Sequence, residues 1–141
     1  MKNAFDPNEV KWSLERGTST IKGQGFLRTV GGEVRTCAGY PVKLVPYSAY
    51  TGEIYEASIS GQLTAGIANK DSASGAFRKM TQCDAQGNFE FTDLPAGRWF
   101  AETIVHWQVP NGYIMSNQGG WIGSGIITTI PNKVTSVLIT R

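Results

Sequence analysis

The alternation of apolar and polar positions is clearest near the middle of the chain. Phe89 and Phe91 alternate with polar residues, the pattern of a strand with one buried face. A turn at 84–87 precedes them, and the segment 93–97 follows with Asp, Pro and Gly, residue types that reverse the chain. We therefore predict a strand around the two phenylalanines and a second strand at 98–105 that returns antiparallel to it.

Further strands are predicted on both sides of this hairpin. Residues 19–30 read as a strand, and Val42 and Leu44 should point inward from a short strand bounded by prolines. The segment 99–107 is apolar on both faces and should lie in the middle of a sheet. The β-branched segment 126–140 is expected to form a closing hairpin.

Glycines and mixed composition make other stretches harder to interpret. Gly23 and Gly25 lie two residues apart on one strand face, which leaves room for a large neighbour, an aromatic of the facing sheet for example, or marks a bulge. Residues 116–125 are expected to form a flexible glycine-rich loop that carries Trp121. Residues 56–80 fit a short helix or a long crossover, and both alternatives stay open.

One helix is predicted, at 5–17. Asp6 is a good N-cap, a proline follows at the first helical position, and Gly17 would supply a left-handed stop. We expect residues 1–18 to form an N-terminal helical extension and residues 19–141 to form the β domain.

Composition narrows the class of protein. In a chain of 141 residues, only 17% of residues are charged and 17 are Gly, which favours an all-β domain with short strands. The formal charge of +2 is spread without a basic cluster, so nucleic acid is not expected as a partner. The apolar stretches are too short for a membrane-spanning helix. No signal peptide is visible, so the protein either stays in the cytoplasm or is exported with its leader removed.

The two cysteines, Cys37 and Cys83, do not form a Cys-x-x-Cys pair. A disulfide between them is the simplest interpretation and favours export, while two separate buried thiols remain the alternative. With only His106 as a further ligand, no zinc site is expected.

No catalytic group or cofactor is expected either. His106 is the only imidazole and lies inside a predicted central strand, where a structural role is more common than a role as base. Asp84 and Asp93 occupy turns in which Asp caps backbone amides, so they do not require a catalytic explanation.

Aromatic residues are the best candidates for a recognition surface. Rings on a rigid scaffold bind sugars or protein partners, but they also pack over a core. The candidate ligand or partner residues are Tyr47, Tyr50, Tyr55, Trp107 and Trp121.

Two segments carry a resemblance to a known family. The strings Gly39-Tyr-Pro-Val-Lys-Leu-Val-Pro and Cys83-Asp-Ala-Gln-Gly-Asn-Phe-Glu-Phe-Thr-Asp-Leu-Pro-Ala-Gly-Arg-Trp resemble carboxypeptidase regulatory-like domains. The resemblance covers about residues 19–140 and implies a transthyretin-like, roughly seven-stranded Greek-key β-sandwich. It also implies an accessory module of secreted or envelope proteins. The stretch from Trp12 through residues 23–34 resembles small exported bacterial proteins.

Some relatives of this fold have covalent or enzymatic activity that depends on particular residues. Hydroxyisourate hydrolases and intradiol dioxygenases need more than one histidine, whereas this chain has only His106, so neither activity is expected. Collagen-adhesin B-type domains would imply an isopeptide bond between Lys22 and Asn132 beside Glu102. However, the residues after Lys22 differ from theirs and Asn132 lies in a predicted turn, so Glu102 is expected instead to be an edge or paired carboxylate.

The sequence therefore predicts a non-catalytic interaction or structural module of a bacterial envelope or extracellular protein. It would bind a protein partner or assemble through its sheet edges. A carbohydrate-binding module that uses the loop aromatics, and a subunit of an extracellular fibre or oligomer, are the alternatives.

Overall fold

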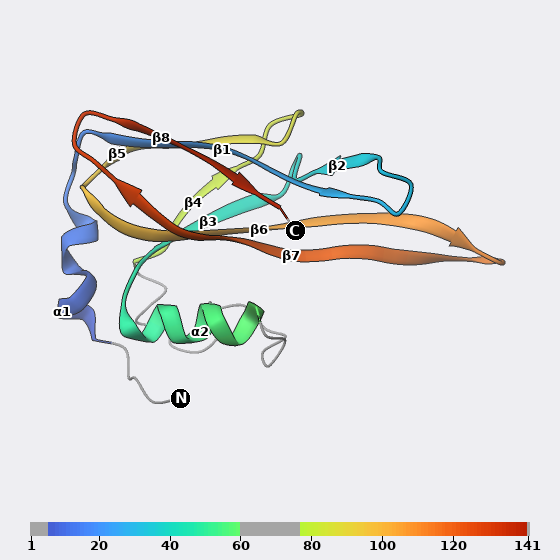
Figure 1. Ribbon diagram of the computed structural model, residues 1–141, viewed down its shortest axis with the longest axis horizontal. Coiled ribbons are helices and arrows are strands. Elements are labelled where there is room, and N and C mark those ends of the chain that lie inside the picture. Colours follow the sequence, from blue (N-terminus) through green and yellow to red (C-terminus); the bar gives the residue numbers. More distant parts are fainter. Residues whose placement is uncertain (1–5, 60–76, 141) are drawn as a thin grey trace.

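The structure, a computed structural model, describes residues 6–59 and 77–140 and confirms an all-β sandwich. Figure 1 shows two stacked sheets, with helix α2 on the outer side of the second sheet. Within the described ranges each sheet has four strands, which makes eight in place of the seven that were expected.

The first sheet is built around β1 (Ser19–Arg28). This strand pairs antiparallel with β2 (Val34–Thr36) and β5 (Asn88–Leu94) and parallel with β8 (Val134–Ile139).

The second sheet has the order β4-β3-β6-β7. Its strands are β3 (Pro41–Pro46), β4 (Lys79–Gln82), β6 (Gly97–Asn111) and β7 (Ile114–Thr129). Strand β6 pairs with both β3 and β7, which confirms the central position predicted for residues 99–107.

The inner faces of the two sheets form the core. Phe89 and Phe91 are 5% and 6% exposed, so the predicted alternation is correct. Val42 and Leu44 are fully buried, as predicted, and Trp99 of β6 is buried between the sheets. The other main members of the core are Ile21, Leu27, Leu94, Ala101, Val105, Ile122, Ile127 and Ile139.

Two predicted hairpins were wrong. Strand β5 pairs with β1 whereas β6 pairs with β3 and β7, so residues 93–97 turn the chain from one sheet to the other. Asp93 takes the corner with φ 56°. Strands β7 and β8 also lie in different sheets, because β8 pairs parallel with β1. Turn residues reverse a chain equally well within a sheet and between sheets, so the sequence did not distinguish these cases.

The predicted glycine-rich loop at 116–125 was also wrong, because these residues belong to β7 and pair with β6. Gly119 has φ +91°, and a Cβ there would lie 2.0 Å from the Val105 carbonyl oxygen. The glycines therefore allow close approach and local bends inside a paired strand, which is a known use of glycine in sheets.

The N-terminal helix begins as predicted and ends early. Asp6 Oδ1 accepts a hydrogen bond from the Asn8 N–H at 3.0 Å, which confirms the N-cap. Helix α1 (Pro7–Val10) continues only as the 3₁₀ turn η1 (Lys11–Leu14). Gly17 is not among the described residues with positive φ, so the left-handed stop was wrong. Its missing side chain instead admits the backbone of Leu94, because a Cβ would lie 2.0 Å from that carbonyl oxygen.

The beginning of the segment 56–80, for which the sequence left two alternatives open, is helical. Helix α2 (Ala49–Ile59) is preceded by a capping box in which the Ser48 N–H donates to Thr51 Oγ1 and the Thr51 N–H donates to Ser48 Oγ. For most of the remaining segment the choice between a short helix and a long crossover stays open, because residues 60–76 lie outside the described residues.

The disulfide between Cys37 and Cys83 is confirmed. Cys37 directly follows β2 of the first sheet, and Cys83 directly follows β4 of the second. The bond therefore connects the two layers. Over the ranges that the structure describes, no helix has the length and apolar character needed to span a bilayer.

Candidate functional site

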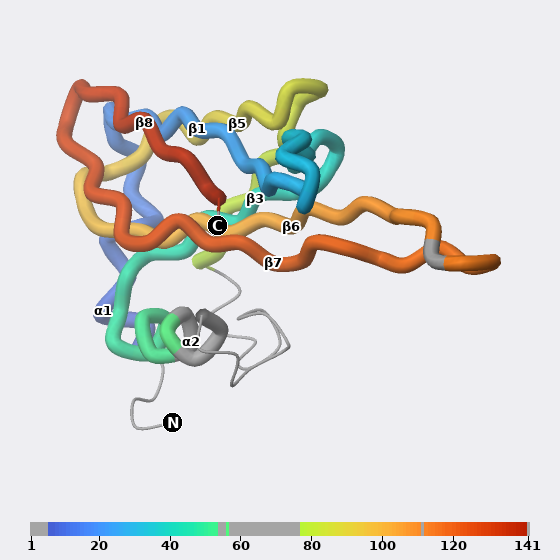
Figure 2. Tube along the Cα trace, turned by 45° about the vertical axis from the view of Figure 1, so that its right-hand side comes forward, coloured from blue at the N-terminus to red at the C-terminus, as the bar shows by residue number. Residues whose placement is uncertain are grey.

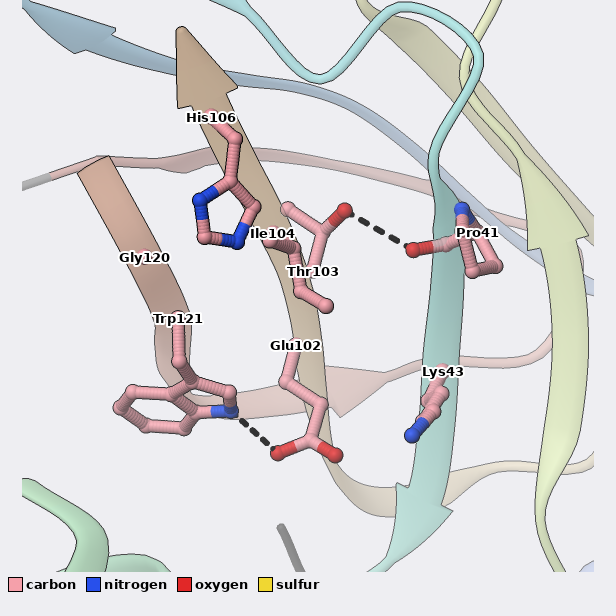
Figure 3. Close-up of a pocket in the computed structure, with 8 residues that line it drawn as sticks. All are labelled: Pro41, Lys43, Glu102, Thr103, Ile104, His106, Gly120 and Trp121. Atoms are coloured by element: carbon pink, nitrogen blue, oxygen red, sulfur yellow. Dashed lines mark hydrogen bonds between the residues drawn. The ribbon is translucent and has the colours of Figure 1, made fainter. Parts of the chain in front are cut away.

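A pocket of about 330 Å³ lies on the outer face of the second sheet. Its lining comes from β3, β6 and β7, as Figure 3 shows. Alternation along β6 sends Glu102, Ile104 and His106 to this face, while Ala101 and Val105 join the core. The lining residues are Pro41, Lys43, Glu102, Thr103, Ile104, His106, Gly120 and Trp121.

Glu102 is the buried charged group of the pocket. Only 5% of the residue is exposed, and its Oε2 accepts a hydrogen bond from Trp121 Nε1 at 2.6 Å. A buried carboxylate is costly unless it accepts hydrogen bonds, and bonds to a charged acceptor are among the strong ones. The bond therefore orients the carboxylate and the indole relative to each other (Figure 3).

The strand register brings these two side chains together. Trp121 is the pairing partner of Ile104, two residues beyond Glu102, and the β6–β7 register shifts between Phe100 and Glu102. Glu102 and Ile104 lie on the same face of β6, so Glu102 and Trp121 are diagonal cross-strand neighbours on that face.

Lys43 is the cross-strand neighbour of Glu102 on β3. In Figure 3 the carboxylate lies between the indole and the lysine amine. The ion pairs of the described chain are Arg16–Asp93, Lys22–Glu90 and Arg35–Glu33, so the Lys43 amine is more than 4.0 Å from the carboxylate oxygens. A donor and an acceptor thus face the same pocket without satisfying each other.

His106 and Pro41 also line the pocket. His106 is exposed, and its ring lies 6.1 Å from the ring of Tyr40. Thr103 Oγ1 donates to the Pro41 carbonyl oxygen at 2.9 Å, which ties β6 to the start of β3 at this point.

The predicted aromatic residues do not form one surface. Tyr47, Tyr50 and Trp121 gather with Val45 and Phe100 in a small cluster. Tyr50 is only 5% exposed.

Trp107 packs instead against the main core of the sandwich. The side chain of Tyr55 lies outside the described residues. Of the four predicted rings that the structure describes, Trp121 is the one that lines the pocket.

The three residues considered for an isopeptide bond are not brought together. Lys22 forms an exposed ion pair with Glu90, 3.3 Å long, on the first sheet. Glu102 bonds to Trp121 on the second sheet, and Asn132 lies in the turn between β7 and β8 with φ 63°.

The sequence interpretation missed Lys43, and it considered His106 only as a base. Both lie at polar positions within otherwise apolar strands, Lys43 between Val42 and Leu44 and His106 between Val105 and Trp107. This pattern could have placed them on the outer face, but it does not show which strands lie side by side.

No group of three or more His, Cys, Asp or Glu side chains that could hold a metal ion is found in the described part of the chain. The arrangement at the pocket can form hydrogen bonds and apolar contacts with an uncharged polar ligand.

Comparisons with known proteins show the fold alone. No family model matches the chain, and neither does any curated protein. Among solved structures, the chain is similar to a protein from Pseudomonas aeruginosa whose crystal structure, at 2.61 Å resolution, is presented as that of a "putative carbohydrate binding protein". The TM-score is 0.83 at 19% sequence identity, over 99% of this chain and 99% of that chain. The two chains therefore share a β-sandwich architecture along nearly their whole length.

Proposed function

We propose that this chain is a non-catalytic carbohydrate-binding module that holds a sugar in the pocket between β3, β6 and β7. The observation that carries the proposal is the pairing of the Trp121 indole with the buried Glu102 carboxylate at one pocket. The proposal gives preference to carbohydrate over the protein partner that the sequence favoured.

The chemistry of a sugar ring matches this pairing. A pyranose presents apolar C–H groups on its faces and hydroxyl groups around its edge. The indole offers an apolar wall for the former, whereas Glu102 and Lys43 offer an acceptor and a donor for the latter. The pocket volume of about 330 Å³ lies at the lower end of the usual range for ligand sites, about 300–1,000 Å³, which suits one or two sugar rings.

Two further observations support the proposal. The Pseudomonas protein of the same fold carries a carbohydrate-binding description, and the disulfide suits an oxidising compartment. We further propose that the protein is exported and serves as an envelope or extracellular module, as the resemblance to carboxypeptidase regulatory-like domains implies.

Glycan-array binding, followed by calorimetry on the best ligand, tests the proposal. Trp121→Phe keeps an aromatic wall but removes the N–H that bonds Glu102, so binding should weaken; Trp121→Ala should abolish it. Trp107→Phe is the matched control, because this ring packs against the main core and does not line the pocket. Absence of glycan binding by the folded wild-type protein would contradict the proposal, as would equal losses for the Trp121 and Trp107 variants.

A second candidate function, self-assembly, is favoured by the long β6–β7 hairpin. Figures 1 and 2 show this hairpin extending past the ends of the other strands. Its tip exposes Tyr113, Ile114 and Met115. In the described part of the chain β7 pairs only with β6, which leaves one edge of the strand for pairing with another copy, as in a fibre or oligomer.

Size-exclusion chromatography with light scattering over a range of protein concentrations tests this second candidate. A monomer at every concentration would contradict it. If larger species form, Ile114→Lys on the exposed tip should shift the distribution toward monomer, whereas Lys133→Ala in the β7–β8 turn should not.

A further inference from the structure

We infer that the pocket selects sugars that carry no negative charge, and that Glu102 is the residue that imposes this selection. The inference rests on the proposed function and adds the class of ligand. It excludes uronic acids and sulfated sugars and favours neutral pyranoses with two adjacent hydroxyl groups.

The first argument is the position of the negative charge. Glu102 is 5% exposed and belongs to the pocket lining, so a ligand in the pocket meets its carboxylate with little water between them. Charges in partly buried sites are screened much less than charges on the surface. A ligand carboxylate or sulfate placed here would experience repulsion that solvent does not remove.

The second argument is the fixed orientation of the carboxylate. Its Oε2 is engaged by Trp121 Nε1 at 2.6 Å, so the group cannot rotate away from an incoming anion without losing that bond. Oε1 has no hydrogen-bond donor among the described residues, and an ionised carboxylate can only accept. A sugar hydroxyl supplies the missing donor, whereas an anionic oxygen cannot.

The third argument is the spacing between Glu102 and Lys43. The residues are cross-strand partners, yet the amine is more than 4.0 Å from the carboxylate oxygens. One hydroxyl can donate to Glu102 while the adjacent oxygen accepts from Lys43. A vicinal diol therefore satisfies both groups at once.

Lys43 does not reverse the selection. Its side chain is half-buried, with the amine on a flexible stem, whereas the carboxylate is buried and held by a hydrogen bond. The Lys43 amine can therefore turn away from the pocket toward water, whereas the Glu102 carboxylate and its negative charge stay in the pocket.

Matched pairs of ligands test the inference. The methyl glycosides of glucose, galactose and mannose are each compared with the corresponding methyl uronide by saturation-transfer NMR and tryptophan fluorescence. In each pair that binds, we expect the uronide to bind about tenfold more weakly or worse, because its carboxylate would lie beside the buried Glu102 carboxylate and like charges at an interface repel each other. Glu102→Gln should bring the two affinities within about threefold of each other, since the amide removes the charge but keeps an acceptor for Trp121.

Two further variants separate the effect of the Glu102 charge from the effects of Lys43 and of a carboxylate outside the pocket. Lys43→Met should weaken neutral binding and leave the uronide still weaker, while Glu90→Gln, an exposed carboxylate on the other sheet, should leave every ratio unchanged. If no pair binds, the proposed function and this inference both fail. If uronides bind as well as neutral sugars or better, or if Glu102→Gln keeps the full discrimination, the inference fails while the proposed function stands.

Discussion

At the scale of single residues, Gly23 shows how one absent side chain shapes the core. A Cβ at this position would lie 2.4 Å from Cζ of Phe89 and 2.8 Å from Cγ1 of Val137, the pairing partners of Gly23 on the two neighbouring strands. The sequence indicated room for a large neighbour, which is confirmed. The ring comes from the adjacent strand of the same sheet and not from the facing sheet.

We predict that Gly23→Ala destabilises the fold by about 1–3 kcal/mol, because an added methyl group must displace a buried ring. Alanine is otherwise slightly more stabilising than glycine in a strand interior, so a loss of stability in Gly23→Ala would indicate the steric clash. Gly31→Ala is the control, since the nearest atom to its Cβ would be 3.9 Å away. Chemical denaturation measures both variants, and equal stability of the two would contradict the packing argument.

At the scale of elements, the N-terminal segment is held to the sandwich by Trp12. Its ring makes an edge-on contact with Trp99, with centroids 4.9 Å apart, and it lies against Gly97, where a Cβ would be 2.3 Å from Cζ3 of Trp12. Glu9 adds a second link, because its Oε2 accepts from the Ala49 N–H at 2.8 Å, at the start of α2.

We predict that Trp12→Ala costs about 3 kcal/mol of stability, the usual scale for truncating a packed Trp. Leu14 lies in the same segment but is 61% exposed, so Leu14→Ala should change stability by no more than about 0.5 kcal/mol. Thermal and denaturant unfolding of both variants provide the measurement. A large loss in Leu14→Ala, or none in Trp12→Ala, would show that Trp12 does not hold the segment in place.

The positions of the strands could be predicted more readily than their partners. Phe89 and Phe91 define β5 through alternation, a property of neighbours along the chain. Pairing depends on contacts between distant residues, and the turn at 93–97 has the same composition whether it closes a hairpin or joins two sheets. The segment 116–125 looked like a loop because glycine is a poor strand former, yet β6 supplies its backbone with hydrogen-bond partners.

The candidate site shows the same division between local and distant information. Glu102 and Trp121 were both singled out from the sequence, but for unrelated reasons. Their hydrogen bond depends on the β6–β7 register, in which Trp121 pairs with Ile104, and alternation does not encode register. Lys43 joins them only because β3 lies beside β6, which is a feature of the topology.

At the scale of the whole molecule, the sandwich is held by more than packing. The disulfide closes a sequence separation of 46 residues and joins the end of β2 in one sheet to the end of β4 in the other. Both cysteines are buried. The disulfide therefore links the two layers of the folded protein and restricts the unfolded chain.

We predict that reduction of the wild-type protein lowers its free energy of unfolding by about 2–4 kcal/mol, since a loop of this length restricts the unfolded chain by about 4 kcal/mol in the entropic account. The double variant Cys37→Ala, Cys83→Ala should have the stability of the reduced wild type and be insensitive to reductant. Urea denaturation with and without reductant, with thiol quantification as a control, measures both. Unchanged wild-type stability after complete reduction would mean that core packing alone holds the two sheets together. In that case the pocket, whose described lining residues belong to the second sheet, should bind its ligand equally well in both redox states.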